Sequence, residues 1–139
     1  MEFREVPRSE IESHVRPKMM SDPLSRDAQM AAAMLSGRIK AWLCMDGSQA
    51  VGNCVADSAT GEVLSIGVNA SHEGAGIGRR LLSLAVGWLR STGAQRIWVA
   101  APSDTTLRAY GFYRALGWRP SGERTTTGDE ILELPADSA

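Results

Sequence analysis

Hydrophobic and polar residues follow a pattern along this chain that predicts strands and helices in mixed order. Apolar runs of strand length end at glycine or proline, while longer stretches repeat apolar residues every three to four positions, as amphipathic helices do. The strands expected from this pattern cover residues 1–7, 41–45, 50–56, 62–68, 97–101, 118–121 and 125–134. The helices expected cover residues 10–20, 27–35, 76–92 and 104–116. The pattern therefore predicts an α/β fold with a mixed sheet.

Capping residues set the expected helix boundaries. Ser9 forms a capping box with Glu12, which predicts the start of the first helix. Asp104 or Ser103 is the expected N-cap of the last helix, which ends near Leu116.

Turn residues and isolated glycines predict how the strands connect. The pair Asp46-Gly47 marks a hairpin, and a second turn at 58–61 leads into the strand 62–68, so three antiparallel strands follow one another. Gly67 inside that strand indicates a bulge or a close backbone approach. Gly111 costs helix stability, which predicts a close contact at that position.

The stretch after this strand carries three glycines, Gly74, Gly76 and Gly78, just before a helix. Glycines let backbone N–H groups approach a ligand, and a helix N-terminus attracts anions, so the stretch predicts a phosphate site. A tight turn without a ligand explains the same spacing. Arg79 and Leu81 stand where a dinucleotide fingerprint needs small residues, and no Gly-Lys-Ser/Thr follows as in a Walker A loop.

Two segments resemble motifs of the GNAT N-acetyltransferase superfamily. The segment Glu73-Gly-Ala-Gly-Ile-Gly78, five residues after Val68, resembles motif A, Arg/Gln-x-x-Gly-x-Gly/Ala. Residues 109–118 resemble motif B, Ala-x-x-x-Tyr-x-x-x-Gly-Phe. The departures are Glu73 in place of arginine or glutamine, Thr106 in place of asparagine, and Trp118 in place of phenylalanine. The resemblance is best over residues 62–118 and implies a GNAT-like fold, in which about four helices flank a mostly antiparallel sheet of six to seven strands.

The resemblance implies an N-acetyltransferase that uses acetyl-CoA as acyl donor and a primary amine of a small molecule or peptide as acceptor. Transfer in this family is direct, in a ternary complex, without a protein nucleophile. The strand around Val68 is expected to pair with the pantetheine arm, and the glycine stretch to cradle the pyrophosphate. The cofactor-binding residues that the resemblance implies are Ile66, Val68, Glu73, Gly74, Ala75, Gly76, Ile77, Gly78, Arg79 and Thr106. We expect Glu73 to turn outward, toward Arg79 or Arg80.

Two further residues match catalytic positions of the family. Tyr113 falls on the position of the general-acid tyrosine, although an aromatic packing on the core explains it as well. Glu62 lies six residues before Val68, where histone-type members carry a general-base glutamate. A solvated glutamate after the turn at Gly61, with water as the base, is the other interpretation of Glu62.

Size and charge narrow the remaining possibilities. A chain of 139 residues with 43% hydrophobic and 22% charged residues fits one globular domain, here residues 1–135 with a disordered tail at 136–139. The net charge of −1 argues against a nucleic-acid partner. Residues 71–124 nevertheless carry eight arginines and three acidic residues, a balance that suits a phosphorylated ligand unless the arginines are merely solvated.

Targeting and metal signals are weak throughout the sequence. The lack of a long apolar run or a signal-peptide pattern predicts no membrane association and a cytoplasmic location. We interpret Cys44 and Cys54 as buried free thiols rather than a disulfide or a metal site, and His14 and His72 as surface residues, so no metal is expected. A homodimer is possible.

The acceptor and the catalytic status stay open. The acidic residues Glu12, Asp22 and Asp27 favour a cationic amine, but a solvated acidic face explains them equally. The alternative function is a non-catalytic acyl-CoA-binding sensor or partner module with the same fold. The two hints toward it are Glu73, which places a negative charge in the expected phosphate site, and the short length of the chain.

Overall fold

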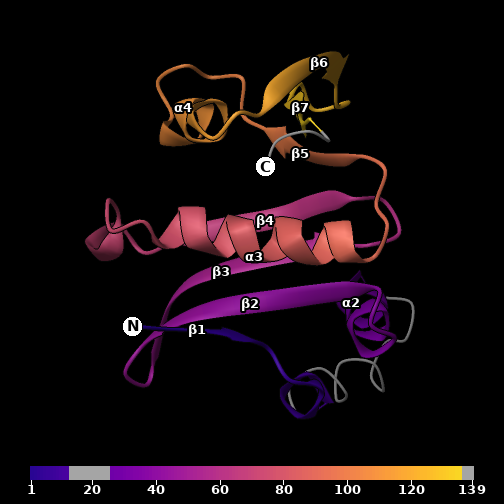
Figure 1. Cartoon of the computed structure of the whole chain (residues 1–139), viewed down its shortest axis with the longest axis vertical. Helices are drawn as coiled ribbons and strands as arrows, with labels where there is room; N and C mark the ends of the chain where they lie inside the picture. The colour runs from indigo at the N-terminus through magenta and orange to yellow at the C-terminus, as the bar shows by residue number, and fades with distance from the viewer. Residues whose placement is uncertain (13–25, 136–139) are drawn as a thin grey trace.

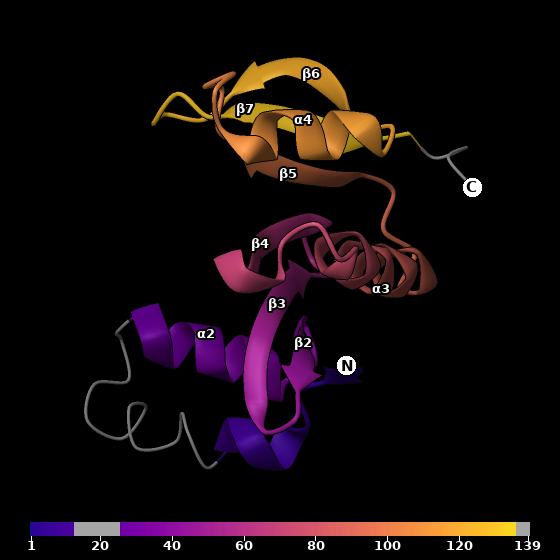
Figure 2. The same cartoon turned by 90° about the vertical axis from the view of Figure 1, so that its left-hand side faces the viewer.

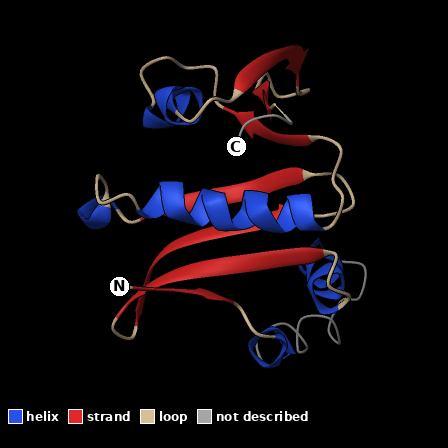
Figure 3. Ribbon diagram, viewed as in Figure 1, coloured by secondary structure: helices blue, strands red, loops and turns tan. Residues whose placement is uncertain are grey.

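The computed structural model describes residues 1–12 and 26–135 of the chain. Seven strands form one sheet in the order β1-β2-β3-β4-β5-β7-β6, and every neighbouring pair is antiparallel except β4 and β5. Figure 3 shows the mixture of helices and strands, which confirms the predicted α/β fold with a mixed sheet. The strands are β1 (Glu2–Glu5), β2 (Ile39–Asp46), β3 (Gln49–Asp57), β4 (Glu62–Val68), β5 (Ile97–Ala101), β6 (Arg119–Arg124) and β7 (Glu130–Leu134).

The helices lie on both faces of this sheet. Residues 8–12 are helical, and they are followed along the chain by α2 (Arg26–Leu35), a 3₁₀ turn η1 (Ala70–His72), α3 (Ile77–Ser91) and α4 (Arg108–Ala115). Figure 1 shows α3 crossing the middle of the sheet, with α4 beside β5, β6 and β7. Figure 2 shows that α2 and α3 cover opposite faces. No helix in residues 1–12 or 26–135 is long and apolar enough to cross a bilayer.

Helix α3 anchors the core because its apolar residues repeat with helical spacing. Its buried residues are Ile77, Leu81, Leu82, Ala85, Val86 and Leu89. They pack on β2, β3 and β4, and full burial of one such leucine contributes about 1.5–3 kcal/mol. Gly52 on β3 lets the helix come close, since a Cβ there would lie 2.9 Å from Cγ2 of Ile77 and 3.0 Å from Cδ1 of Leu81. This packing fixes the start of α3 against the end of β4.

Strand β4 separates from β5 soon after it begins. The two strands pair only at Glu62 and Trp98, so the rest of β4 has no partner on that side. On its other side β4 pairs with β3, and the register shifts so that Leu64 has no partner in β3. The bulge expected at Gly67 therefore lies three residues earlier. Gly67 makes a close approach instead, since a Cβ there would lie 3.0 Å from Oδ1 of Asn53.

Several predicted boundaries are wrong near the ends of the helices. Residues 8–12 are already helical and the N–H of Ile11 donates to the carbonyl of Pro7, so Ser9 lies inside the helix and is not its N-cap. Helix α4 begins at Arg108, with Leu107 at the N-cap and no side-chain cap. Asp104 instead accepts hydrogen bonds from the N–H and the hydroxyl of Thr106, which closes a separate turn.

Two further expectations in the C-terminal third are corrected. A Cβ at Gly111 would meet no atom within 4 Å, so no close contact requires that glycine. Strand β6 extends to Arg124, and residues 125–129 form a turn in which the N–H of Thr125 donates to the carbonyl of Asp129, so β7 begins only at Glu130. Residues 13–20 of the first predicted helix, His14, Asp22 and the predicted tail 136–139 lie outside the described residues.

Candidate functional site

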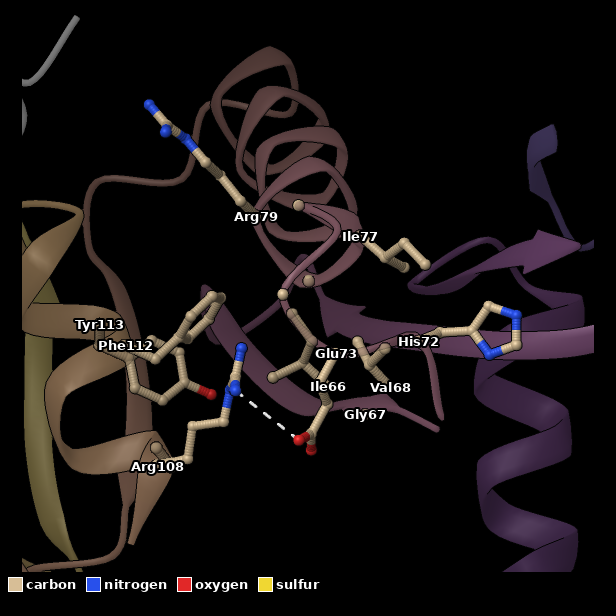
Figure 4. A pocket seen from close by; sticks show the side chains of 14 residues that line it. Ile66, Gly67, Val68, His72, Glu73, Ile77, Arg79, Arg108, Phe112 and Tyr113 are labelled. Atoms are coloured by element: carbon tan, nitrogen blue, oxygen red, sulfur yellow. Dashed lines mark ion pairs between the residues drawn. The ribbon is translucent and has the colours of Figure 1, made fainter. Parts of the chain in front are cut away.

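A cavity of about 400 Å³ opens between the end of β4, the glycine-rich loop before α3, and α4. This volume is within the range of small-molecule binding sites. Figure 4 shows its lining, which consists of Ile66, Gly67, Val68, His72, Glu73, Gly74, Gly76, Ile77, Gly78, Arg79, Arg108, Ala109, Phe112 and Tyr113.

The separation of β4 from β5 creates one wall of this cavity. Ile66, Gly67 and Val68 line it, and none of them pairs with β5. A strand edge without a partner strand presents backbone N–H and C=O groups that an extended ligand with amide groups can pair with. The wall is therefore suited to a narrow, amide-containing chain.

The glycine-rich loop forms the end of the cavity. Gly74 and Gly76 have φ values of +82° and +81°, a left-handed conformation that side-chain-bearing residues rarely adopt. Gly76 is the N-cap of α3, has no side-chain cap, and is followed by a first turn without acidic residues. The first N–H groups of α3 are thus left for a ligand, and the helix dipole favours an anion there.

Gly78 allows the start of α3 to lie close to Phe112 of α4 and Val68 of β4. A Cβ at Gly78 would lie 3.4 Å from Cζ of Phe112 and 3.5 Å from Cγ2 of Val68. Any longer side chain at this position would project into the space that these residues border.

Tyr113 is almost buried, with 5% of its surface exposed. Its ring packs edge-to-face against Phe112 and Trp118, with ring centroids 5.2 and 5.7 Å away, and Figure 4 shows its phenol oxygen directed into the cavity. Burial, with a smaller effect of the Cys54 thiol, raises the pKa of Tyr113 to about 12. The phenol therefore keeps its proton at neutral pH and can donate a hydrogen bond to a group in the cavity.

Glu73 forms an ion pair with Arg108, the first residue of α4, with 3.6 Å between Oε2 and Nη1. The expectation that Glu73 turns toward Arg79 or Arg80 is wrong, because Arg108 is the partner. Arg79 lines the cavity, whereas the Arg80 guanidinium lies 4.7 Å from the ring centroid of Phe3 and outside the lining.

His72 connects the cavity to the β2–β3 hairpin. Its Nε2 lies 3.0 Å from Oδ2 of Asp46 and its Nδ1 lies 2.8 Å from the hydroxyl of Ser71. Its side chain is 20% exposed, which is less than the prediction of a surface histidine implies. Figure 4 shows its ring pointing away from the cavity, and His72 therefore holds η1 in place and not a ligand.

Three predicted site residues lie outside the cavity lining: Glu62, Ala75 and Thr106. Glu62 is at the opposite end of β4 from Val68, about 20 Å along an extended strand. Burial and the neighbouring Asp57 carboxylate raise the pKa of Glu62 above its ordinary value. Thr106 donates from its hydroxyl and N–H to Asp104, which lowers the pKa of that carboxyl.

The sequence interpretation missed several lining residues. Arg108, Ala109 and Phe112 lie on α4 five, four and one residues before Tyr113 and line the cavity with it. The i, i+4 spacing of Ala109 with Tyr113 and of Arg108 with Phe112 was the signal that could have identified them. The sequence predicts a bulge or a close backbone approach at Gly67 and does not identify it as a lining residue.

Comparisons with known proteins identify the family of the chain. The family model described as Acetyltransferase (GNAT) family matches residues 4–118. No curated protein gives a significant match to the sequence.

Solved structures resemble the chain over nearly its whole length. The PaiA N-acetyltransferase from Thermoplasma acidophilum in complex with coenzyme A is 14% identical with a TM-score of 0.69, covering 96% of this chain and 99% of that one. An aminoglycoside 6′-acetyltransferase type Ii is 21% identical with a TM-score of 0.68, covering 96% of each chain. An aminoglycoside 6′-N-acetyltransferase complexed with coenzyme A is 18% identical with a TM-score of 0.66, covering 96% of this chain and 94% of that one. At these identities the likeness supports the fold, and the family model supports membership. The chain belongs to the GNAT acetyltransferase family.

Proposed function

We propose that the protein is an N-acetyltransferase that moves the acetyl group of acetyl-CoA directly to a primary amine of a small molecule or peptide. The observation that carries the proposal is one cavity lined by three complementary parts. These are the unpaired edge of β4 at Ile66–Val68, the uncapped N-terminus of α3, and the phenol of Tyr113. Two of the similar solved structures contain coenzyme A, which supports this choice of ligand.

Each part of the cavity suits one part of acetyl-CoA. The diphosphate would accept hydrogen bonds from the first N–H groups of α3, where Gly74 and Gly76 leave the approach open. The pantetheine amides would pair with the edge of β4 between Ile66 and Val68. This orientation brings the thioester along β4 toward Tyr113, whose hydroxyl has no hydrogen-bond partner among residues 1–12 and 26–135.

In the transfer step the amine nitrogen attacks the thioester carbon, the C–N bond forms and the C–S bond breaks. The nitrogen loses one proton and the leaving sulfur gains one, so no other reactant is needed. Tyr113 donates a hydrogen bond to the sulfur, which stabilises the charge that develops as the C–S bond breaks. With its pKa at about 12, the phenol is a weaker acid than a free tyrosine, so its proton moves only late in bond cleavage.

Glu62 is proposed as the base that receives the proton of the amine through a chain of waters, since it lies four residues before Ile66 and outside the cavity lining. Its raised pKa makes the carboxylate a better proton acceptor than an ordinary glutamate. Asp57 lies opposite Glu62 in the register and contributes to this raised pKa, while its own carboxylate pairs with Arg38 at 3.0 Å.

The test is release of free CoA from acetyl-CoA in the presence of a panel of amines, with the acetylated product identified by mass spectrometry. Tyr113→Phe should lower kcat by about 10- to 1,000-fold and leave the affinity for CoA unchanged. Tyr110→Phe is the matched control, because Tyr110 lies on the same helix, stacks with Arg114 at 3.9 Å, and does not line the cavity.

The outcomes separate the possible functions. Binding of CoA without transfer to any amine would favour the non-catalytic acyl-CoA sensor. Loss of stability in Tyr113→Phe with unchanged turnover per folded molecule would make Tyr113 a packing residue. If neither CoA nor acetyl-CoA binds, the proposed function is refuted.

A further inference from the structure

The ion pair between Glu73 and Arg108 connects the glycine-rich loop with α4 at the cavity. Glu73 belongs to the loop before α3, and Arg108 begins α4, five residues before Tyr113. The Nη1–Oε2 distance is 3.6 Å, and the side chains are 65% exposed for Arg108 and 42% exposed for Glu73. Figure 4 shows the Arg108 side chain extending from α4 toward Glu73, with the ion pair drawn as a dashed line. Such an exposed and slightly long pair is easily exchanged for a better one.

Within residues 1–12 and 26–135, Glu73 is the only carboxylate that lines the cavity, and the other two permanent charges in that lining are Arg79 and Arg108. A carboxylate, like a phosphate, offers only hydrogen-bond acceptors and matches the fork of a guanidinium. Its carboxylate also lies beside the loop that leads to the uncapped N-terminus of α3, where an anion is favoured. Glu73 thus supplies a negative charge at the end of the cavity that attracts one.

The two arginines differ in direction. Figure 4 shows the Arg79 side chain extending away from the cavity, whereas the Arg108 guanidinium reaches across it toward the loop. Arg108 is therefore the arginine already placed at the phosphate end, and its partner there is a carboxylate of the chain itself.

We propose that Arg108 binds the diphosphate of acyl-CoA and that it exchanges Glu73 for this ligand when the cavity fills. This inference rests on the proposed function. On binding, the like charges of Glu73 and the diphosphate repel each other, Glu73 leaves the cavity, and Arg108 keeps an anionic partner throughout. Because the ligand must displace Glu73, binding is weakened and release of the product CoA is accelerated. The exchange also transmits occupancy of the phosphate end to α4, the helix that carries Tyr113.

The test is a double-mutant cycle on the dissociation constant of CoA, measured by calorimetry for the unaltered protein, Glu73→Gln, Arg108→Gln and the double variant. Arg108→Gln should weaken binding by about 5- to 20-fold, as expected for loss of a charge-assisted hydrogen bond to phosphate. Glu73→Gln should tighten it by about 2- to 5-fold, and more at low salt, where screening is weakest.

The exchange predicts that the two substitutions are not additive. Arg108 is free to bind phosphate once Glu73 is gone, so Arg108→Gln should cost about 2- to 5-fold more in the Glu73→Gln background than in the unaltered protein. Additive effects would mean that Glu73 only repels the ligand, which overturns the exchange. Weaker binding by Glu73→Gln would overturn it as well.

Truncated ligands locate the contact on CoA. With dephospho-CoA, which keeps the diphosphate and lacks the 3′-phosphate, the effect of Arg108→Gln should remain. Loss of that effect would assign Arg108 to the 3′-phosphate and refute the proposal. Pantetheine, which has neither phosphate, should bind the four proteins equally.

Arg90→Gln is the matched control, because it removes the same charge from the exposed last turn of α3, outside the cavity lining. It should leave the affinity for CoA unchanged. An effect as large as that of Arg108→Gln would mean that the net charge of the protein, and not a contact of Arg108, explains the loss of affinity. If CoA fails to bind the unaltered protein, the proposed function fails. If CoA binds and Arg108→Gln has no effect, only the exchange fails.

Discussion

Replacing Gly78 by aspartate should stabilise the free protein and at the same time abolish CoA binding. Gly78 is the second residue of α3, whose first turn has no acidic residue and whose N-cap has no side-chain hydrogen bond. Aspartate near a helix N-terminus interacts favourably with the helix dipole. The same carboxylate would project beside Phe112 and Val68 into the proposed diphosphate site.

The size of the stabilisation follows from two small contributions. Aspartate has a better helix propensity than glycine by about 0.3 kcal/mol, and an acidic residue in the first turn contributes about 0.3–1 kcal/mol. The new Cβ would lie 3.4 Å from Phe112, an ordinary contact distance, so no large steric cost offsets this gain. A total of about 1 kcal/mol should raise the melting temperature by about 3–5 °C for a chain of this size.

The assay is a thermal melt with and without CoA. In the unaltered protein, CoA at 100 times its dissociation constant should add about 2.7 kcal/mol, or roughly 10 °C. In Gly78→Asp this shift should be absent although the starting temperature is higher, which excludes misfolding as the cause. Gly87→Ala is the control, because Gly87 lies on the same helix with no atom within 4 Å of an added Cβ, and it should be stabilised with the CoA shift intact. A full CoA shift in Gly78→Asp would refute the phosphate site at this helix end.

Two further predictions concern β4 and the turn that precedes it. In the pH profile of kcat/KM, activity should fall as the pH drops through the pKa of Glu62, and because that pKa is raised the limb should lie above the ordinary value of about 4.3. Glu62→Gln should remove the limb, and a limb that persists in this variant would identify water as the base. Gly61→Ala should destabilise the protein by at least about 3 kcal/mol in urea unfolding, because φ is +76° and the new Cβ would lie 1.8 Å from the carbonyl oxygen of Arg96. Gly93→Ala, with φ of +84° and open space around it, should cost only about 1–2 kcal/mol, and equal losses in the two variants would contradict the steric explanation.

The fold could be predicted well wherever one local pattern determines an element. The apolar spacing of α3 gave its buried face, including Ile77 and Leu89, and the pair Asp46-Gly47 gave the hairpin between β2 and β3. The bulge at Leu64 could not be located in this way, since it arises from the register with β3 and not from the residue itself. The prediction that Asp104 caps the last helix was wrong because the same side chain can cap a helix or close a turn with Thr106.

The candidate site was predictable in its backbone and less so in its charges. The glycines identified the loop because only glycine tolerates the φ values found at Gly74 and Gly76. The partner of Glu73 could not be found by sequence proximity, since Arg108 is 35 residues away and reaches the loop only because β4 and β5 separate. The role of Glu62 stays a prediction, because it lies at the far end of the strand from the phosphate loop.

The separation of β4 from β5 also predicts where partial unfolding of the protein begins. Near the bridge of Glu62 with Trp98, the N–H of Trp98 donates to the carbonyl of Gly61 and its indole donates to that of Thr60, at 3.1 and 3.0 Å. Strands β1–β4 and strands β5–β7 are therefore joined by few backbone hydrogen bonds, and sub-global opening should begin along this line. Amide hydrogen exchange should report it as earlier exchange along this seam than in the centre of each half. An extended ligand between β4 and β5 would add backbone hydrogen bonds where the two strands do not pair, so that the two halves unfold as one cooperative unit.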